Sequence, residues 1–350
     1  MVLDKDLIMD SLRRVEDPEI HKSLVELDMI KGIEISGDRV VVVVNLTIKG
    51  CPMKSKIRED IVYEVGKLEG VDEVEVVFDA MSEEEKRKLR EKLYGTQKEL
   101  FKGIPVIAIG SGKGGVGKST ITANLAVTLG KMGHRVGLLD GDILGFSIAR
   151  ILGIAHKKAQ LLSKNTLLPV EEYGIKIISM GNLVEEDEAV VWRGPVLGKL
   201  LDQFFNDVYW GEIDFLLIDL PPGTGDVPLT IMQKIPNSKF VVVTSPQPSA
   251  ARVAGRLWTM SQKAGIEVVG IIENMSHFVC QNCGEIHYIF GKGEGERLSL
   301  KTGTELIGEI PLKKEIRMTS DEGRPIVVED ADTFELYKSI AERLVRKVRG

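Results

Sequence analysis

Two cysteines, Cys280 and Cys283, are separated by two residues in the stretch VCQNCG, a spacing at which two thiolates can bind one metal ion or cluster. The chain contains one other cysteine, Cys51, so two thiols are only half of a four-ligand site. Zinc could complete its ligands with His277 and His287, although their spacing differs from that of a zinc finger. A redox-active dithiol is another interpretation. An iron–sulfur cluster would need further thiolates from elsewhere.

A glycine-rich loop has the composition of a phosphate-binding site. In the run PVIAIGSGKGGVGKST, residues Gly112, Gly117, Lys118 and Ser119 fit the pattern G-x-x-x-x-G-K-S/T. The pattern follows an apolar run expected to be a strand and precedes a helix expected to open at Ser119. Backbone N–H groups in such a loop turn toward phosphate oxygens at a helix N-terminus. Lys118 would contact the β and γ phosphates, and the Ser119 hydroxyl would bind Mg²⁺.

Aspartates follow two other apolar runs. Asp219 ends DFLLID, where a carboxylate can hold Mg²⁺ through water, and Asp140 and Asp142 follow RVGLL. Aspartates at strand ends are also common turn formers, so neither position alone indicates catalysis. Together with the phosphate loop they predict a nucleoside triphosphatase.

The apolar runs indicate the fold that positions these side chains. PVIAIG, RVGLLD, DFLLID, KFVVVT and EVVGII are short, continuous and separated by helical stretches, as strands covered on both faces are. We therefore expect an α/β fold with a parallel sheet in residues 104–350. Residues 1–80 combine the β-branched run VVVVNL, a helical apolar pattern and the alternating run VDEVEVVF, which predict a small α+β domain. The charged residues of 81–103 are expected to form a helical linker.

Composition excludes some classes of partner and compartment. With a formal net charge of −6, we expect neither nucleic acid nor an anionic membrane as a partner. No apolar run approaches the length that crosses a bilayer, and the charged first ten residues do not resemble a signal peptide. Three cysteines cannot form a disulfide framework, so we expect a cytoplasmic protein.

The phosphate loop resembles the deviant Walker A motif of the MinD, ParA and nitrogenase iron protein class, because a second lysine, Lys113, follows its first glycine. In that class this lysine contacts nucleotide across a face-to-face homodimer. The resemblance implies that Asp142 orients the attacking water. It also implies that the whole loop binds ATP, through Gly112, Lys113, Gly114, Gly115, Val116, Gly117, Lys118, Ser119 and Thr120.

A series of further motifs is more specific. DLPPGTGD, WRGP, IIENMS, CQNCG, IFGKGEGE and DEGRPIV occur in this order and closely resemble the Mrp (ApbC) family of iron–sulfur cluster carrier ATPases. The N-terminal motifs VEDPEI and TIKGCP resemble the iron–sulfur assembly domain often fused ahead of them. The resemblance implies transfer of a cluster, by expectation 4Fe–4S, from upstream assembly proteins to apo iron–sulfur acceptor proteins. It also implies that Asn274 contacts the adenine edge.

The implied homodimer would complete the cysteine site. Two copies related by a twofold axis bring two Cys-x-x-Cys pairs together, which supplies four thiolates from Cys280 and Cys283 to one bridging cluster. Cys51 precedes Pro52 where a helix is expected to begin, so its thiol is either a transient ligand beside the main site or a packed side chain.

A MinD/ParA-like positioning ATPase, acting at a membrane or nucleoid surface, is the alternative function. Its membrane-binding element would be the amphipathic C-terminal stretch TFELYKSIAERLVRKVR. We expect that stretch instead to be a last helix whose apolar face docks on the core.

Overall fold

The computed structural model describes residues 3–18, 22–46, 53–82, 85, 89, 103–143, 145–163, 166–183, 204, 207–224 and 238–349. The chain divides into two compact units. The first consists of Met1–Gln97 with Leu161–Thr166, and the second of Lys98–Gln160 with Leu167–Gly350.

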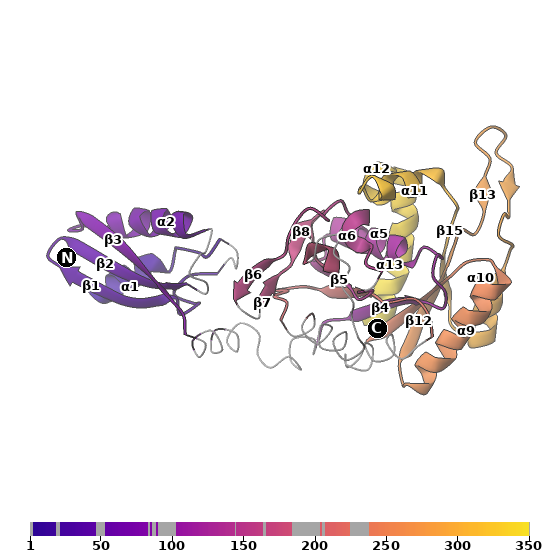
Figure 1. The fold of residues 1–350 in the computed structure, drawn as a ribbon, viewed down its shortest axis with the longest axis horizontal. Coiled ribbons are helices and arrows are strands. Elements are labelled where there is room, and N and C mark those ends of the chain that lie inside the picture. The colour runs from indigo at the N-terminus through magenta and orange to yellow at the C-terminus, as the bar shows by residue number, and fades with distance from the viewer. Residues whose placement is uncertain are drawn as a thin grey trace. The chain divides into compact units, whose positions relative to one another are not determined.

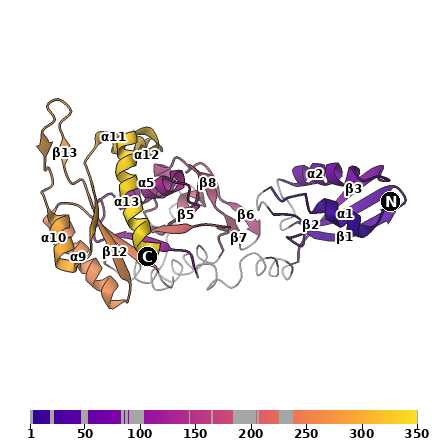
Figure 2. The same ribbon diagram turned by 180° about the vertical axis from the view of Figure 1, so that it is seen from behind.

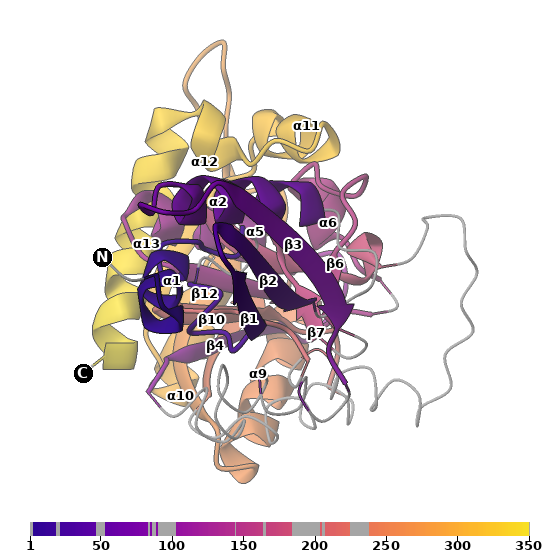
Figure 3. The ribbon, with the colours of Figure 1, turned by 90° about the vertical axis from the view of Figure 1, so that its left-hand side faces the viewer.

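The first unit has an α+β fold. Its elements are α1 (Lys5–Leu12), β1 (Ile30–Ser36), β2 (Arg39–Leu46), α2 (Lys54–Gly66) and β3 (Glu73–Ala80). The strands lie side by side in the order β1-β2-β3, with β2 antiparallel to β1 and parallel to β3 (Figure 3). Ile57, Ile61 and Val65 of α2 are completely buried, because their helical spacing places them on one face. The prediction of a small α+β domain is confirmed.

The second unit is built on a large, mostly parallel sheet. Its strand order is β15-β12-β11-β4-β10-β5-β9-β8, in which β8 runs antiparallel to β9. The strands are β4 (Val106–Ser111), β5 (Val136–Asp140), β8 (Val170–Glu172), β9 (Ile175–Ile178), β10 (Phe215–Asp219), β11 (Lys239–Thr244), β12 (Glu267–Asn274) and β15 (Leu306–Ile310). Every residue of β4, β5 and β10 is buried, as continuous apolar runs in a parallel sheet predict. The predicted α/β fold is confirmed.

Helices cover both faces of this sheet (Figures 1 and 2). The helices on one face are α5 (Lys118–Lys131), α6 (Ile148–Ile151), α12 (Ile326–Glu329) and α13 (Ala331–Arg349), with α11 (Lys314–Asp321) beside them. The helices on the opposite face are α9 (Pro248–Lys263) and α10 (Glu294–Thr302). The short elements are β6 (Gln160–Ser163), β7 (Thr166–Leu168), the 3-10 helix η1 (Met180–Asn182), β13 (Phe278–Val279) and β14 (Ile286–His287).

The C-terminal helix α13 docks on the core, as its amphipathic pattern predicts. Tyr337, Ile340 and Leu344 are buried in the cluster that includes α5, and Phe334 and Val348 pack against the same cluster. The apolar face that a membrane-binding helix would need is therefore covered by protein. In the part of the chain that the structure describes, no helix combines the length and apolar character needed to span a bilayer.

Some sequence predictions concern residues outside the part of the chain that the structure describes. The linker of residues 81–103 lies outside the described residues apart from Met81, Ser82, Gly103 and the helical Glu85 and Leu89. Cys51 and Pro52 also lie outside them, as does the WRGP motif at residues 192–195.

Candidate functional site

The phosphate loop connects β4 to α5, the strand–loop–helix context that its sequence requires. Gly117 caps α5 with a left-handed φ of 84°, so α5 begins at Lys118, one residue earlier than expected. A Cβ on Gly117 would lie 2.2 Å from the Asn274 amide nitrogen, and one on Gly112 would lie 2.6 Å from the Val253 backbone carbon of α9. The glycines therefore permit both the loop's turn and the close approach of two other elements.

Lys118, Ser119 and Asp219 form one hydrogen-bonded cluster at the start of α5. Asp219 ends β10, which is parallel to and paired with β4, so both strands deliver their C-terminal ends to this edge of the sheet. Lys118 Nζ and Ser119 Oγ each lie 2.6 Å from Asp219 Oδ2. Both Lys118 and Asp219 are buried, at 5% and 0% exposure. The ammonium and carboxylate thus neutralise each other away from solvent.

Thr122 is a further member of this cluster. Its Oγ1 lies 2.8 Å from Asp219 Oδ1 and 2.9 Å from the Lys118 carbonyl, and it is fully buried. With a single proton to donate, the hydroxyl favours the charged acceptor. Thr122 was not predicted as a site residue, because its partner Asp219 lies 97 positions away in the sequence.

The two aspartates that follow β5 have different surroundings. Asp140 is fully buried and accepts hydrogen bonds from Ser179 Oγ at 2.8 Å and from the Ile148 and Asp142 backbone N–H groups at 3.3 and 3.2 Å. Burial, together with the nearby charge of Asp219, raises the pKa of Asp140 to about 7. Asp140 therefore holds the backbone that follows β5.

Asp142 lines the cavity beside the phosphate loop. It accepts a hydrogen bond from the Gly145 N–H at 3.1 Å. Burial raises its pKa, while the positive charge of Lys118 opposes that shift. Of these two aspartates, Asp142 is the one that lines the cavity.

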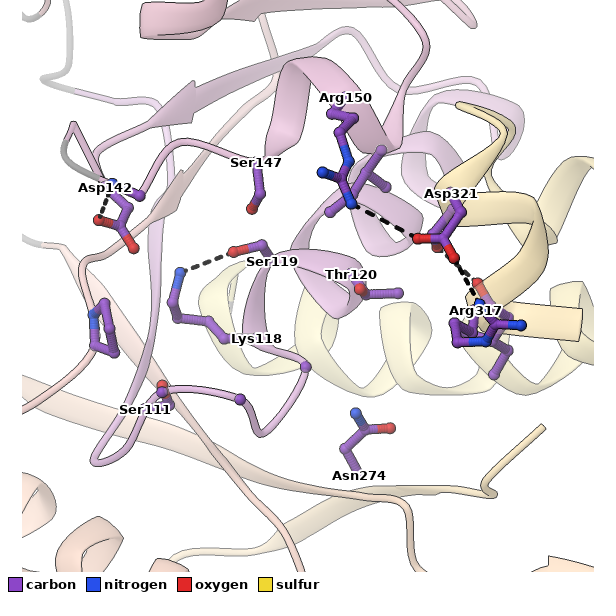
Figure 4. A pocket seen from close by; sticks show the side chains of 18 of the residues that line it. Ser111, Lys118, Ser119, Thr120, Asp142, Ser147, Arg150, Asn274, Arg317 and Asp321 are labelled. Carbon is purple, nitrogen blue, oxygen red and sulfur yellow. Dashed lines mark hydrogen bonds and ion pairs between the residues drawn. The ribbon is translucent and has the colours of Figure 1, made fainter. Parts of the chain in front are cut away.

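The cavity has a volume of about 580 Å³, which is within the range of small-molecule sites. Figure 4 shows Lys118, Ser119 and Asp142 toward one end and Arg317 and Asp321 toward the other. Asp321 is 2.8 Å from Arg317 and 3.7 Å from Arg150 of α6. This far wall, from α6 and α11, was not predicted from the sequence.

Asn274 also lines the cavity, from the end of β12. Its Nδ2 donates a hydrogen bond of 2.8 Å to the Val116 carbonyl, so the side chain reaches the phosphate loop. Met275, which follows, has a left-handed φ of 58° that is uncommon for a residue with a side chain. By contrast, Lys113 is exposed on the loop and, in the described part of the chain, is not among the residues lining the cavity.

The two cysteines lie on the tip of a hairpin that projects from the body of this unit (Figures 1 and 2). β13 and β14 pair antiparallel, and the Cys280 N–H donates to the Glu285 carbonyl at 2.9 Å. The Gly284 N–H closes the turn on the Cys280 carbonyl at 2.8 Å. Cys280 is half-buried and Cys283 is exposed, so both thiols are accessible.

The turn also changes the acidity of the Cys280 thiol. Backbone N–H groups of Cys283 and Asn282 donate to its sulfur and lower the pKa of the Cys280 thiol. The thiolate is the form that binds metal. Four apolar side chains around the tip are exposed: Val279, Ile286, Tyr288 and Ile289.

The histidines proposed for zinc are engaged elsewhere. His277 Nδ1 lies 3.0 Å from Ser276 Oγ, and the His287 ring packs against Phe278 near the Glu285 carboxylate. Among the residues that the structure describes, no group of three His, Cys, Asp or Glu side chains could hold a metal ion. The hairpin thus offers two thiols rather than a four-ligand zinc site.

Comparison with known proteins places both units. Residues 104–347 match the family described as ParA, NUBPL iron-transfer P-loop NTPase, and residues 5–76 match an iron–sulfur cluster assembly protein family. The chain is 39% identical to an iron–sulfur cluster carrier protein of Bacillus subtilis over 352 residues, covering 99% of each chain. The carrier protein of Deinococcus radiodurans is 40% identical over 345 residues, which cover 98% of this chain and 95% of that one. The chain belongs to the iron–sulfur cluster carrier family of P-loop NTPases.

Solved structures agree with this assignment. A nucleotide-binding protein of Archaeoglobus fulgidus in complex with ADP is 42% identical to this chain, with a TM-score of 0.59 over 69% of this chain and 95% of that one. The septum site-determining protein MinD of Pyrococcus horikoshii, at 24% identity, has a TM-score of 0.53 over 69% of this chain and 96% of that one, and shows a shared fold. With the family match over residues 104–347, this identifies the chain as an ATPase of the ParA/MinD type.

Within this chain, Lys118, Ser119, Asp142 and Asn274 line one cavity, and the buried Asp219 accepts a hydrogen bond from Ser119. Cys280 and Cys283 lie on a separate hairpin of the same unit.

Proposed function

We propose that the protein binds an iron–sulfur cluster, of 4Fe–4S type, between the cysteine hairpins of two copies and transfers it to apoproteins. The observation that carries this proposal is the hairpin tip. It presents two accessible thiols and a thiolate-stabilising turn. Four thiolates are needed for such a cluster, and two hairpins supply them. The exposed Val279, Ile286, Tyr288 and Ile289 would be buried where the tips meet.

ATP would occupy the cavity beside the phosphate loop. We assign the phosphate contacts to the loop from Gly112 to Thr120, and assign Lys118 to the terminal phosphates. Because Lys118 is 2.6 Å from Asp219, its ammonium must exchange the carboxylate for phosphate oxygens when nucleotide binds. Asp142 would orient the attacking water, and Asn274 would contact the base after leaving the Val116 carbonyl.

The residues present also fit Mg²⁺. Ser119 Oγ and Asp219 Oδ2 are hard oxygen donors only 2.6 Å apart at the start of α5, the ligand type that Mg²⁺ prefers. When bound, the ion would neutralise charge on the phosphates. Ser119 would ligate it directly, and Asp219 would hold it through water.

Lys113 supports a homodimer with shared active sites. It is exposed and, within the described residues, does not line the cavity of its own chain. A cation in this position is available to the nucleotide of a second copy facing the loop. The same dimer would bring the two hairpins together.

The remaining assignments follow from this role. We propose apo iron–sulfur proteins as acceptors, upstream assembly proteins as donors, and neither nucleic acid nor membrane as a partner. Accessible Cys280 and Cys283 suit a reducing cytoplasm. We divide the chain into an assembly-like domain of residues 1–80, a linker of 81–103 and an ATPase domain of 104–350.

The test is anaerobic reconstitution with iron and sulfide, followed by metal and sulfide analysis and native mass. We expect a dimer holding about four iron atoms and an equal amount of sulfide. Cys280→Ala or Cys283→Ala should lose the cluster and keep nucleotide binding, whereas the matched variant Lys118→Ala should keep the cluster and lose ATP hydrolysis. One metal ion per monomer without sulfide would favour zinc. Cosedimentation of the unloaded protein with lipid vesicles would favour a MinD-like positioning protein.

A further inference from the structure

Two cavities of the ATPase unit share a wall. The nucleotide cavity ends at residues 311–313, which connect β15 to α11. A second cavity, of about 600 Å³, lies on the other side of the same three residues and is lined by Cys280, Gln281 and Asn282 of the hairpin turn. A displacement of residues 311–313 would therefore change the lining of both cavities.

Hydrogen bonds tie the wall to the base of the hairpin. β12 and β15 pair in parallel up to Asn274 and Ile310. The pairing continues beyond these strand ends, because the Ser276 N–H donates to the Ile310 carbonyl at 3.0 Å and the Leu312 N–H donates to the His277 carbonyl at 2.7 Å. A displacement of residues 311–313 would thus carry the backbone that leads into β13.

Helix α11 contacts both cavities. Near its start, the Glu315 Oε1 atom accepts a hydrogen bond of 3.1 Å from Gln281 Nε2, and Gln281 lies between the two cysteines in the sequence. Farther along the helix, Ile316, Arg317 and Asp321 line the nucleotide cavity. No residue of α11 is fully buried, and its half-buried Ile316 packs against the core, so a shift of the helix would disturb few core contacts.

We propose that α11, with residues 311–313, is a positioning element that sets the geometry of the Cys280–Cys283 turn according to what occupies the nucleotide cavity. This inference rests on the proposed function, to which it adds the route of regulation. Glu315 and Gln281 are positioning residues, since they bond to each other and neither lines the nucleotide cavity. Coupling between two sites is reciprocal, so the state of the thiols also alters nucleotide affinity.

The experiment measures iodoacetamide alkylation of Cys280 and Cys283 by mass spectrometry, in the full-length apo protein with and without Mg–ADP. It needs no cluster. We expect Mg–ADP to change the Cys280 rate by about fivefold, the low end of allosteric couplings. Glu315→Ala and Gln281→Ala should each bring that ratio close to one while still binding Mg–ADP. The double variant should lose no more than either single variant, because both remove the same bond.

Glu322→Ala is the matched control. Glu322 caps the other end of α11 and pairs with Arg324, away from the hairpin, so its ratio should equal that of the unmodified protein. Gln281 is exposed, so its variant keeps the test valid if Glu315→Ala fails to fold. An unmodified protein whose alkylation ignores Mg–ADP, or variants that keep the full response, would overturn this inference and leave the carrier proposal standing. A protein whose alkylation responds to Mg–ADP but that fails to assemble a cluster would support this inference and contradict the carrier proposal.

Discussion

Asp219 accepts hydrogen bonds on both of its carboxylate oxygens, and the donors serve different purposes. Lys118 and Ser119, which line the cavity, bond to Oδ2, while Thr122 bonds to Oδ1 from within α5. The first two donors were predicted as functional because their motif is local. Thr122 was not, because its contact joins residues 97 positions apart. A contact of that kind depends on strand order rather than on spacing.

Thr122→Val tests whether this hydroxyl orients the carboxylate. Valine keeps the shape and removes the donor, so Asp219 should rotate and nucleotide affinity should lose much of its dependence on Mg²⁺, by about tenfold. Calorimetric titration of ADP with and without Mg²⁺ measures this. Thr122→Ser keeps the hydroxyl and should keep the normal dependence of nucleotide affinity on Mg²⁺. Thr128→Val is a buried control, because the Thr128 Oγ1 bonds to the Asn124 carbonyl within α5, and it should also keep that dependence. Equal Mg²⁺ dependence in the Val and Ser variants would assign Thr122 to packing alone.

Lys113 can be tested by complementation between chains. Lys113→Ala should lower hydrolysis by about a thousandfold, the low end for a cation supplied in trans. Lys118→Ala should also be inactive. Mixing the two variants should restore hydrolysis, because the intact Lys118 site of one chain then receives Lys113 from the other. The ATPase rate of mixed dimers is the measurement, and an inactive mixture would show that Lys113 acts within its own chain.

At the scale of elements, the strands were predictable and the hairpin was not. Continuous apolar runs identified β4, β5, β10, β11 and β12, because a strand buried on both faces leaves that pattern. β13 and β14 contain only two residues each, too few for any periodicity. The hairpin is therefore identified only from the backbone hydrogen bonds of the structure, such as that from the Cys280 N–H to the Glu285 carbonyl.

The hairpin turn predicts a pH dependence. Because N–H groups of Cys283 and Asn282 stabilise the thiolate, the folded pKa of Cys280 lies below its usual value. Its alkylation rate should rise at a lower pH in the native apo protein than in the same protein unfolded in urea. The shift also implies that this thiol adds stability when ionised, which is lost as the pH falls through the folded pKa. Rate profiles that coincide in both states would show that the turn does not stabilise the thiolate.

At the scale of the whole molecule, helices far from the phosphate loop in the sequence form the rest of the cavity wall. The cavity's far wall comes from α6 and α11, where Arg150 and Arg317 meet Asp321. Arg317 and Asp321 are four residues apart on α11, which is an ordinary helical pair, but Arg150 meets Asp321 only because the fold brings α6 beside α11. The two matched families, by contrast, could be inferred from ordered motifs that span nearly the whole chain.

The N-terminal unit has its own prediction. If Cys51 guides iron–sulfur species, then Cys51→Ala, or removal of residues 1–95, should leave ATP hydrolysis and the Cys280/Cys283 cluster intact and slow delivery to an acceptor apoprotein. Acceptor activation over time, at equal cluster loading, measures this. Unchanged transfer in both variants would make Cys51 structural and give the domain another task.

The pairing of Lys118 with Asp219 also bears on the order in which ligands arrive. Asp219 Oδ2 bonds to the Lys118 ammonium, and it is the same oxygen that we assign to the metal site. A phosphate that draws Lys118 away would leave a fully buried carboxylate uncompensated, and a metal that takes the carboxylate would leave the ammonium without its partner. Binding of phosphate alone or of metal alone therefore costs free energy. When both bind together, Lys118 pairs with phosphate and Asp219 with the metal, so neither buried charge is left without a partner. The pocket should consequently discriminate against free nucleotide and free metal alike, and select their complex from solution.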